Sequence, residues 1–292
     1  MRSVLPMVLI AGLALVGAVG CSSDNGDSDG DGGAAGAAAY PYPDGGGVPT
    51  TDLDEFSFFV TSLEGLQRLS GSQTGFGGDL RYGEADGLSG ADKICTQIAE
   101  YSMAGAGQKG WRAFLSVTAG PDASPVHAID RIGQGPWYDR LGRLVAMNLD
   151  DLANERPVGA DPAIINDLPN EYGVPNHAPD PEEGEVDNHD MLTGSDDEGR
   201  LYDDEESTCQ DWTSSVGSDG RPRCGHSWPR DGGGGRPGGD DGGGMAHWIS
   251  ALDEAGCAPG VSLVESGGPD PSNPTVGSGG GYGGFYCFAL VP

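Results

Sequence analysis

The stretch from Asp190 to Ser214 constrains the fold more than any other part of the chain, because two further segments must be assembled around it. Its pattern predicts a strand, an acidic turn and a second strand that carries Cys209 and Trp212. The other two segments are a helix over residues 90–100, which contains Cys95, and a C-terminal strand over residues 285–290, which contains Cys287.

The helix over 90–100 is the best defined of the expected elements. Ser89 can cap it, with Asp92 as the other half of a capping box. Its apolar residues fall on one face, which places Cys95 in the core. Three other patterns predict strands over 56–61 and 111–117 and a hairpin over 137–146.

The first twenty residues are typical of an export signal rather than of a folded element. Arg2 precedes an apolar run over 4–19, and small residues lead to Cys21. This arrangement resembles a bacterial lipoprotein signal, which implies cleavage before Cys21 and lipidation of that residue; an ordinary secretory signal is the alternative. Ser22 resembles signals that direct the product to the outer membrane or cell surface. In either case the chain is exported, and disulfides can form.

Residues 21–51 are rich in Gly, Ala and Asp and predict a flexible acidic tether. The folded domain is then expected over 52–292. The chain contains 53 Gly and 21 Pro, many of them within two long insertions at about 150–190 and 229–246. We therefore expect one loop-rich domain, with the first insertion on its surface.

The formal charge of −30 argues against a nucleic-acid partner, because such a chain repels phosphate backbones. It is compatible with cation binding or with a solvated acidic surface. The sequence has neither a GxSxG nor an HExxH motif, and the many Asp and Glu residues single out no acid–base pair. Cys224 beside His226 is the nearest approach to a nucleophile, but a structural or spare thiol is favoured. The chain is expected not to be an enzyme.

Several short motifs occur in an order that resembles endostatin and bacterial exported proteins with endostatin-like domains. They are GADKIC, WRAFLS, AIDRI, LTGSDDEGRL, CQDWTS and FYCFAL, with Cys257 between the last two. The resemblance implies a C-type-lectin-like α+β fold, with a mixed, mostly antiparallel sheet, one main helix and long loops. It also implies two nested disulfides, Cys95–Cys287 and Cys209–Cys257. Cys224 is then unpaired or takes part in a different pairing.

Two ligand properties of endostatin do not carry over. Its zinc site uses a histidine-rich N-terminal segment, and no histidine precedes Phe56 here. Its heparin-binding face is rich in arginine, whereas this chain is acidic. Neither ligand is therefore expected on the grounds of the resemblance.

Calcium is a candidate assisting ion, since sugar-binding C-type lectins hold it in their long loop. Oxygen ligands of the type that Ca²⁺ prefers are offered by Asp167, Glu171, Asp187, Asn188 and Asp190, with Asp161 and Asn170 nearby. The family's usual calcium-and-sugar triplets are absent, so a solvated acidic loop is the favoured interpretation and calcium is the alternative. A second alternative is a transition-metal site formed by His189, Asp190 and neighbouring acids.

The sequence thus predicts an exported, lipid-anchored protein of the cell envelope that binds a glycan or protein ligand without catalysis. Trp228 and Trp248 flank the glycine-rich insertion and are the expected exposed contacts for that ligand. The alternative is a structural envelope lipoprotein with no small ligand.

Overall fold

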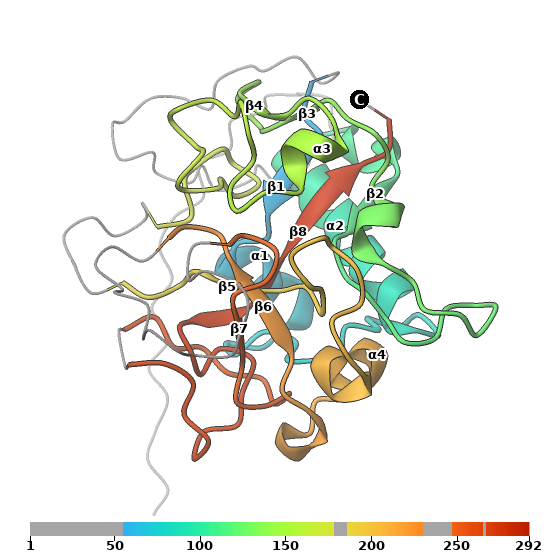
Figure 1. The fold of residues 1–292 in the computed structure, drawn as a ribbon, viewed down its shortest axis with the longest axis vertical. Coiled ribbons are helices and arrows are strands. Elements are labelled where there is room, and N and C mark those ends of the chain that lie inside the picture. The colour runs from blue at the N-terminus through green and yellow to red at the C-terminus, as the bar shows by residue number, and fades with distance from the viewer. Residues whose placement is uncertain (1–54, 178–185, 230–246, 265–266, 292) are drawn as a thin grey trace, which may run out of the picture. The chain divides into compact units, whose positions relative to one another are not determined.

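The C-terminal strand β8 (Gly281–Ala289) is the central element of the fold, and all nine of its residues are buried. The structure is a computed structural model that describes residues 55–177, 186–229, 247–264 and 267–291. The second half of β8 pairs antiparallel with β1 (Phe58–Val60) and β2 (Trp111–Ala113), which lie on its opposite edges. Its first half pairs in parallel with β5 (Asp190–Leu192) (Figure 1).

The sheet continues from β5 through β6 (Arg223–His226) to β7 (Leu252–Asp253), and both of these pairs are antiparallel. The strand order is β1–β8–β5–β6–β7, with β2 paired to β8. A separate hairpin joins β3 (Trp137–Tyr138) to β4 (Leu144–Ala146), as the sequence predicts. The chain is therefore a mixed α+β protein with an open, mostly antiparallel sheet and few helices, which confirms the coarser part of the predicted fold class.

Aromatic packing on β8 explains why this strand lies at the centre of the core. The ring centroid of Phe288 lies 5.0 Å from that of Phe58 and 5.5 Å from that of Trp137. Phe114 packs against the same ring at 5.8 Å. Each aromatic side chain buries a large apolar area, and together they favour burial of the strand on both faces. The predicted strand over 285–290 is thus confirmed, although it begins four residues earlier.

The main helix α2 (Gly87–Ser102) begins earlier than its sequence predicts. Asp86, rather than Ser89, is the N-cap, and its carboxylate accepts a hydrogen bond of 2.8 Å from the Ser89 amide. Asp92 does not complete a capping box. Its carboxylate instead forms a two-pronged ion pair with Arg131, with both N–O distances 2.9 Å, and ties the helix to β2 through Ala113 N.

The remaining helical elements are short. An unpredicted helix, α1 (Leu63–Ser70), is capped by Ser62. The others are η1 (Ala106–Lys109), η2 (Ala128–Arg131), α3 (Leu149–Leu152), η3 (Glu205–Thr208), α4 (Cys209–Trp212) and η4 (Gly217–Asp219). Within the part of the chain that the structure describes, no helix is both long enough and apolar enough to cross a bilayer.

The segment that was predicted to be a second strand is instead a left-handed helical turn, α4. Its four residues have φ values of 49°, 58°, 55° and 61°. This conformation costs a residue other than glycine about 1–2 kcal/mol, because its Cβ crowds the following carbonyl oxygen. The turn is held at both ends: Cys209 is disulfide-bonded, and the buried Trp212 donates from Nε1 to the Ser116 carbonyl at 2.8 Å. Cys and Trp indicated burial correctly, but burial did not decide the backbone conformation.

Two disulfides join cysteines of the described residues, Cys95–Cys287 and Cys209–Cys257. The first joins α2 to β8, and the second joins α4 to the segment that follows β7. Both are the pairs that the endostatin resemblance implies. Cys224 is a free, buried thiol in β6, and its burial raises its pKa well above the usual value. The thiolate form is therefore disfavoured, so neither a different pairing nor a nucleophilic role is supported.

The long segment after α3 is packed into the domain rather than lying on its surface as a solvated loop. Ile164 and Leu168 are fully buried. Arg156 donates hydrogen bonds to the carbonyl oxygens of Ile165, His226 and Ser227 at 2.7–2.8 Å. The prediction of a surface loop over 150–190 is therefore wrong for the residues up to 177. The signal segment, the tether with Cys21, and all but the first residue of the 229–246 insertion lie outside the described residues.

Candidate functional site

Two histidines and an aspartate meet where β5 and β6 lie side by side. His189 precedes β5, Asp190 begins it, and His226 ends β6. The antiparallel register places Asp190 directly opposite His226, so their side chains project from the same face of the sheet. On the other edge of β5 the chain entering β8 is rich in glycine. A Cβ at Gly280 would lie 2.3 Å from Asp187 Oδ1, so the glycines leave room for the acidic side chains.

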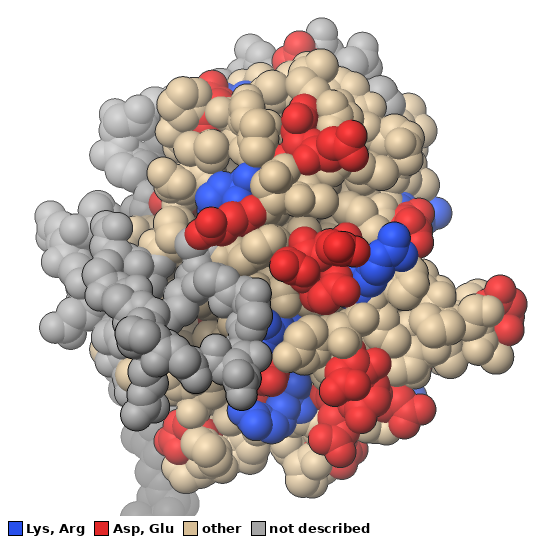
Figure 2. Space-filling view, in the orientation of Figure 1, with Lys and Arg blue, Asp and Glu red and all other residues tan. Residues whose placement is uncertain are grey.

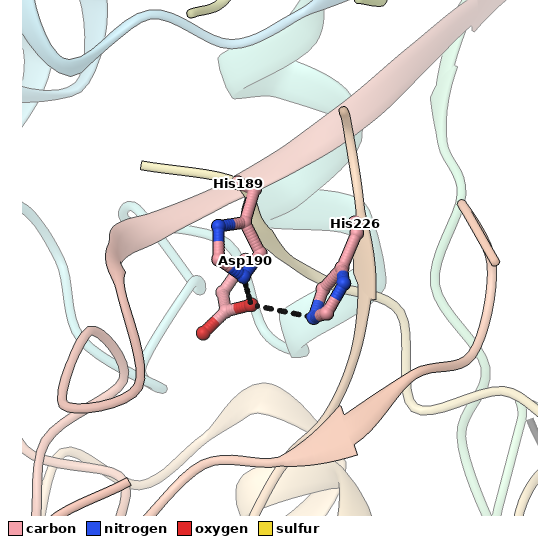
Figure 3. Close-up of side chains that lie close together, drawn as sticks. All are labelled: His189, Asp190 and His226. Carbon is pink, nitrogen blue, oxygen red and sulfur yellow. Dashed lines mark ion pairs between the residues drawn. The ribbon is translucent and has the colours of Figure 1, made fainter. Parts of the chain in front are cut away.

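The three side chains converge on one oxygen atom. Asp190 Oδ1 lies 3.2 Å from His189 Nε2 and 3.1 Å from His226 Nε2 (Figure 3). The imidazole rings meet edge to face, with their centroids 4.1 Å apart. None of the three side chains is more than 1% exposed. The ligand atoms of this triad all lie within 4.8 Å of one another, a spacing that a single metal ion can span.

Two further buried carboxylates adjoin the triad. Asp187 Oδ1 lies 2.8 Å from His189 Nδ1, on the side of the ring that faces away from Asp190. Glu254, just after β7, accepts hydrogen bonds at Oε2 from Ser278 Oγ at 2.7 Å and from the Gly279 amide at 2.8 Å. Its carboxyl group also lies within hydrogen-bonding reach of Asp190. Three carboxylates and two imidazoles thus share one enclosed region.

The electrostatics of the two neighbouring acids differ. Burial alone raises the pKa of Asp190, but the charges of His189 and His226 outweigh this effect and hold its pKa below the usual value. Burial raises the pKa of Glu254 well above its usual value, and the charge of Asp190 adds to that rise. The pKa shifts of these two adjoining carboxyl groups are therefore opposite in direction.

The triad is supported by an outer layer of contacts. Arg156 holds the backbone carbonyl of His226, and burial lowers the pKa of its guanidinium to about 10, so the group stays charged at neutral pH. Trp228 donates from Nε1 to Asn188 Oδ1 at 2.8 Å, and its ring meets that of His189 at 4.8 Å. The ring of the exposed His177 stacks on the Trp228 ring, with the two centroids 4.1 Å apart.

The predicted calcium ligands are not brought together as one set. Asp187 and Asp190 adjoin the triad, but the Asn188 side chain is engaged with Asn176 and Trp228. Glu171 accepts hydrogen bonds from Ser62 N and Oγ at the start of α1, and burial raises its pKa to about 7. Asp167 accepts from the His177 amide, and burial raises its pKa to about 6. Asp161 and Asn170 each bond to amides of their own turns.

The prediction of Trp228 and Trp248 as exposed ligand contacts is wrong. Trp248 is fully buried and packs on Phe114 and Tyr286, with ring centroids 5.3 Å and 5.0 Å away. Trp228 is only 7% exposed. Proximity in sequence to a glycine-rich segment is therefore a poor guide to exposure.

Sequence reasoning missed two members of the buried cluster. His226 was noted only for its proximity to Cys224, and Glu254 was not noted at all. The available signal was the alternation along β6, which places Cys224 and His226 on the same face as the partner strand's Asp190. No spacing in the sequence links Glu254 to the site, since its approach depends on how the sheet is assembled.

A separate hollow of about 620 Å³ opens at the surface. It lies between the first turn of α2, the loop over 117–121 and the left-handed turn α4. Its apolar wall includes Val117, Leu88 and Val126, and the carboxylates of Asp86 and Asp211 lie among its lining residues. Figure 2 shows acidic side chains spread over the visible face, with a dense group at the α4 end of the domain.

The walls of the hollow are fixed to one another through Asp211. Its carboxylate accepts from Thr118 N at 2.7 Å, from Thr118 Oγ1 at 2.8 Å and from Ala119 N at 3.2 Å. These bonds tie α4 to the loop after β2. The hollow is therefore preformed, as binding clefts usually are.

No protein-family model matches this chain, and a comparison with curated proteins finds no match. The resemblance to endostatin-like domains therefore stays a prediction.

Proposed function

We propose that this chain is an exported, lipid-anchored protein whose domain is a non-catalytic binding module, and that its ligand occupies the hollow beside α4. The observation that carries the proposal is the left-handed turn in the wall of that hollow. Four successive residues are held in a conformation that costs about 1–2 kcal/mol each. Backbone strain of this kind persists where the surrounding structure enforces it, and it concentrates at ligand-binding sites.

The lining favours a protein ligand with a basic side chain. The guanidinium of Arg131 is engaged by Asp92, which leaves the carboxylates of Asp86 and Asp211 to set the local charge. An apolar wall with acidic groups suits an apolar stem that ends in a cation, as in lysine or arginine. The lining residues include no aromatic side chain on which a sugar ring could stack. A glycan is therefore the less favoured ligand.

The ligand prediction is tested by presenting the full chain to a display library of random peptides and to a glycan array. We expect enrichment of peptides that contain Lys or Arg. Filling the hollow with Ala119→Trp should abolish their binding, while Ala163→Trp, at an exposed alanine outside the hollow, should leave it unchanged. Binding to glycans that is lost in Ala119→Trp would replace the protein ligand with a glycan. Binding of neither kind would favour the structural envelope lipoprotein.

The anchor is supported by the apolar run that ends in small residues before Cys21. We expect the full chain to sediment with membranes from a bacterial host and to incorporate labelled palmitate. Cys21→Ala should move it to the soluble exported fraction with its label lost. The same membrane association in both forms would contradict lipidation at Cys21 and favour an uncleaved signal, whereas release of both forms would favour an ordinary secretory signal.

A further inference from the structure

We propose that His189, Asp190 and His226 form a binding site for one divalent transition-metal ion of the zinc class. This site is separate from the surface hollow, and it stands or falls independently of the binding-module proposal. Imidazole nitrogen and carboxylate oxygen are ordinary zinc ligands, and this triad offers two of the first kind and one of the second.

The spacing of the ligand atoms fits such an ion. Two atoms bound to zinc at roughly 2.0–2.1 Å in a tetrahedral site lie about 3.3 Å apart. Asp190 Oδ1 is 3.2 Å and 3.1 Å from the two Nε2 atoms. The ring of His226 comes from β6 and that of His189 from the residue before β5, and both point toward this one oxygen (Figure 3). All three ligand atoms lie within 4.8 Å of one another, so the side chains must draw closer together to bind one ion.

Asp187 fixes the orientation of His189. Its Oδ1 atom lies 2.8 Å from Nδ1, so in the neutral imidazole Nδ1 donates its hydrogen there and Nε2 presents a lone pair to Asp190. In that form the lone pair and the carboxylate oxygen, 3.2 Å apart, repel each other unless a positive charge lies between them: either a proton on Nε2, as in the metal-free imidazolium, or a bound metal ion. A carboxylate that supports a metal-binding histidine in this way is a common outer-layer contact of zinc sites. Asp187 is thus a positioning residue.

Glu254 is an independent sign that a positive charge belongs here. The side chain is fully buried, and Oε2 is anchored by Ser278 and Gly279. The other oxygen, Oε1, accepts no hydrogen bond from any described residue, and the carboxyl group adjoins that of Asp190. Keeping both carboxyl groups ionised away from water is costly, and either a proton on Glu254 or a bound cation removes that cost. Glu254 is not one of the three clustered ligand atoms. It is therefore not a ligand in this proposal, but a neighbour of the ligand Asp190.

The ligand atoms of the triad do not suit calcium, the ion considered from the sequence. Ca²⁺ takes six to eight oxygen ligands, whereas two of the three atoms here are imidazole nitrogens. The ion would join β5 to β6 at a buried position and would therefore stabilise the sheet.

The proposal is tested by titrating metal ions into the chelator-stripped full chain. Binding of Zn²⁺ is measured by calorimetry, and binding of Co²⁺, in a separate titration, by its visible absorption. We expect one zinc per chain and the intense cobalt absorption of a tetrahedral nitrogen–oxygen site. His226→Ala should abolish both signals. Asp187→Ala should weaken zinc binding by about 10–100-fold, with partial recovery in Asp187→Asn.

His177→Ala is the matched control, because His177 is exposed, contacts Trp228 and is not among the clustered ligand atoms. It should leave stoichiometry and affinity unchanged. The absence of saturable zinc and cobalt binding to the unmodified chain would overturn the proposal, whatever the folding of the variants. Displacement of zinc by millimolar Ca²⁺, or an equal loss in His177→Ala and His226→Ala, would also overturn it.

Discussion

Removal of the Cys95–Cys287 disulfide is expected to lower the free energy of unfolding by about 5 kcal/mol. The bridge spans 192 residues, and the loop-closure entropy that it removes from the unfolded chain scales with the logarithm of that span. A loss of this size is a large fraction of the stability of a typical domain. The measurement is urea unfolding of the oxidised full chain and of the double variant Cys95→Ala, Cys287→Ala.

Cys224→Ala supplies the matched control, since it deletes a buried sulfur that forms no disulfide. It should cost only about 1 kcal/mol, the scale of a small buried deletion. A double variant that is no less stable than Cys224→Ala would show that the bridge does not restrict the unfolded chain as described.

Loss of the second disulfide should change the hollow as well as the stability. The Cys209–Cys257 bridge spans 48 residues, and its closure entropy corresponds to about 4 kcal/mol. Cys209 begins the left-handed turn, in which each residue carries about 1–2 kcal/mol of strain. Loss of the bridge releases Cys209, while the hydrogen bonds of Trp212 and Asp211 still hold the other end of the turn. Part of the strain is therefore relieved, and this relief offsets part of the lost closure entropy. We therefore expect Cys209→Ala, Cys257→Ala to destabilise the chain less than the first double variant does, while it abolishes binding of peptides selected on the unmodified chain.

Urea unfolding and peptide binding together decide this second prediction. Cys224→Ala again serves as the control and should retain binding. Undiminished peptide binding by Cys209→Ala, Cys257→Ala would mean that the turn keeps its conformation without the bridge. The account of α4 as a disulfide-enforced wall of the hollow would then be wrong.

The sequence was most informative where one physical property decided the outcome. Alternating and helical patterns predicted β8, the β3–β4 hairpin and the buried face of α2, because apolar periodicity reports burial directly. The sequence pattern gave the wrong element at α4, where a cysteine and a tryptophan predicted a strand and the structure has a left-handed turn. There the backbone is set by the disulfide to Cys257, the Trp212–Ser116 hydrogen bond and the hydrogen bonds of Asp211, none of which is local in sequence.

The buried cluster shows the same limitation in the prediction of sites. His189 and Asp190 are adjacent in the chain and were considered together, but His226 joins them only through strand pairing. The predicted calcium ligands do not form one site, because several of them are already hydrogen-bonded to their own neighbours. Glu171 and Asp167 resemble Asp190 in residue type, yet each already binds amides or hydroxyls of its own neighbourhood. Residue type indicates which ligand atoms a chain can offer, and the fold decides which of those side chains come together in one site.

The place of β8 after its sheet partners in the sequence bears on the order in which the domain can form. The partners β1, β2 and β5 all precede it, and Cys95 cannot form its disulfide until Cys287 is present. A polypeptide that emerges from its N-terminus, through a ribosome or a membrane pore, therefore lacks the central strand of the sheet until residues 281–289 have emerged. The sheet cannot close before that point, so the segments that precede β8 can pass through the pore unfolded.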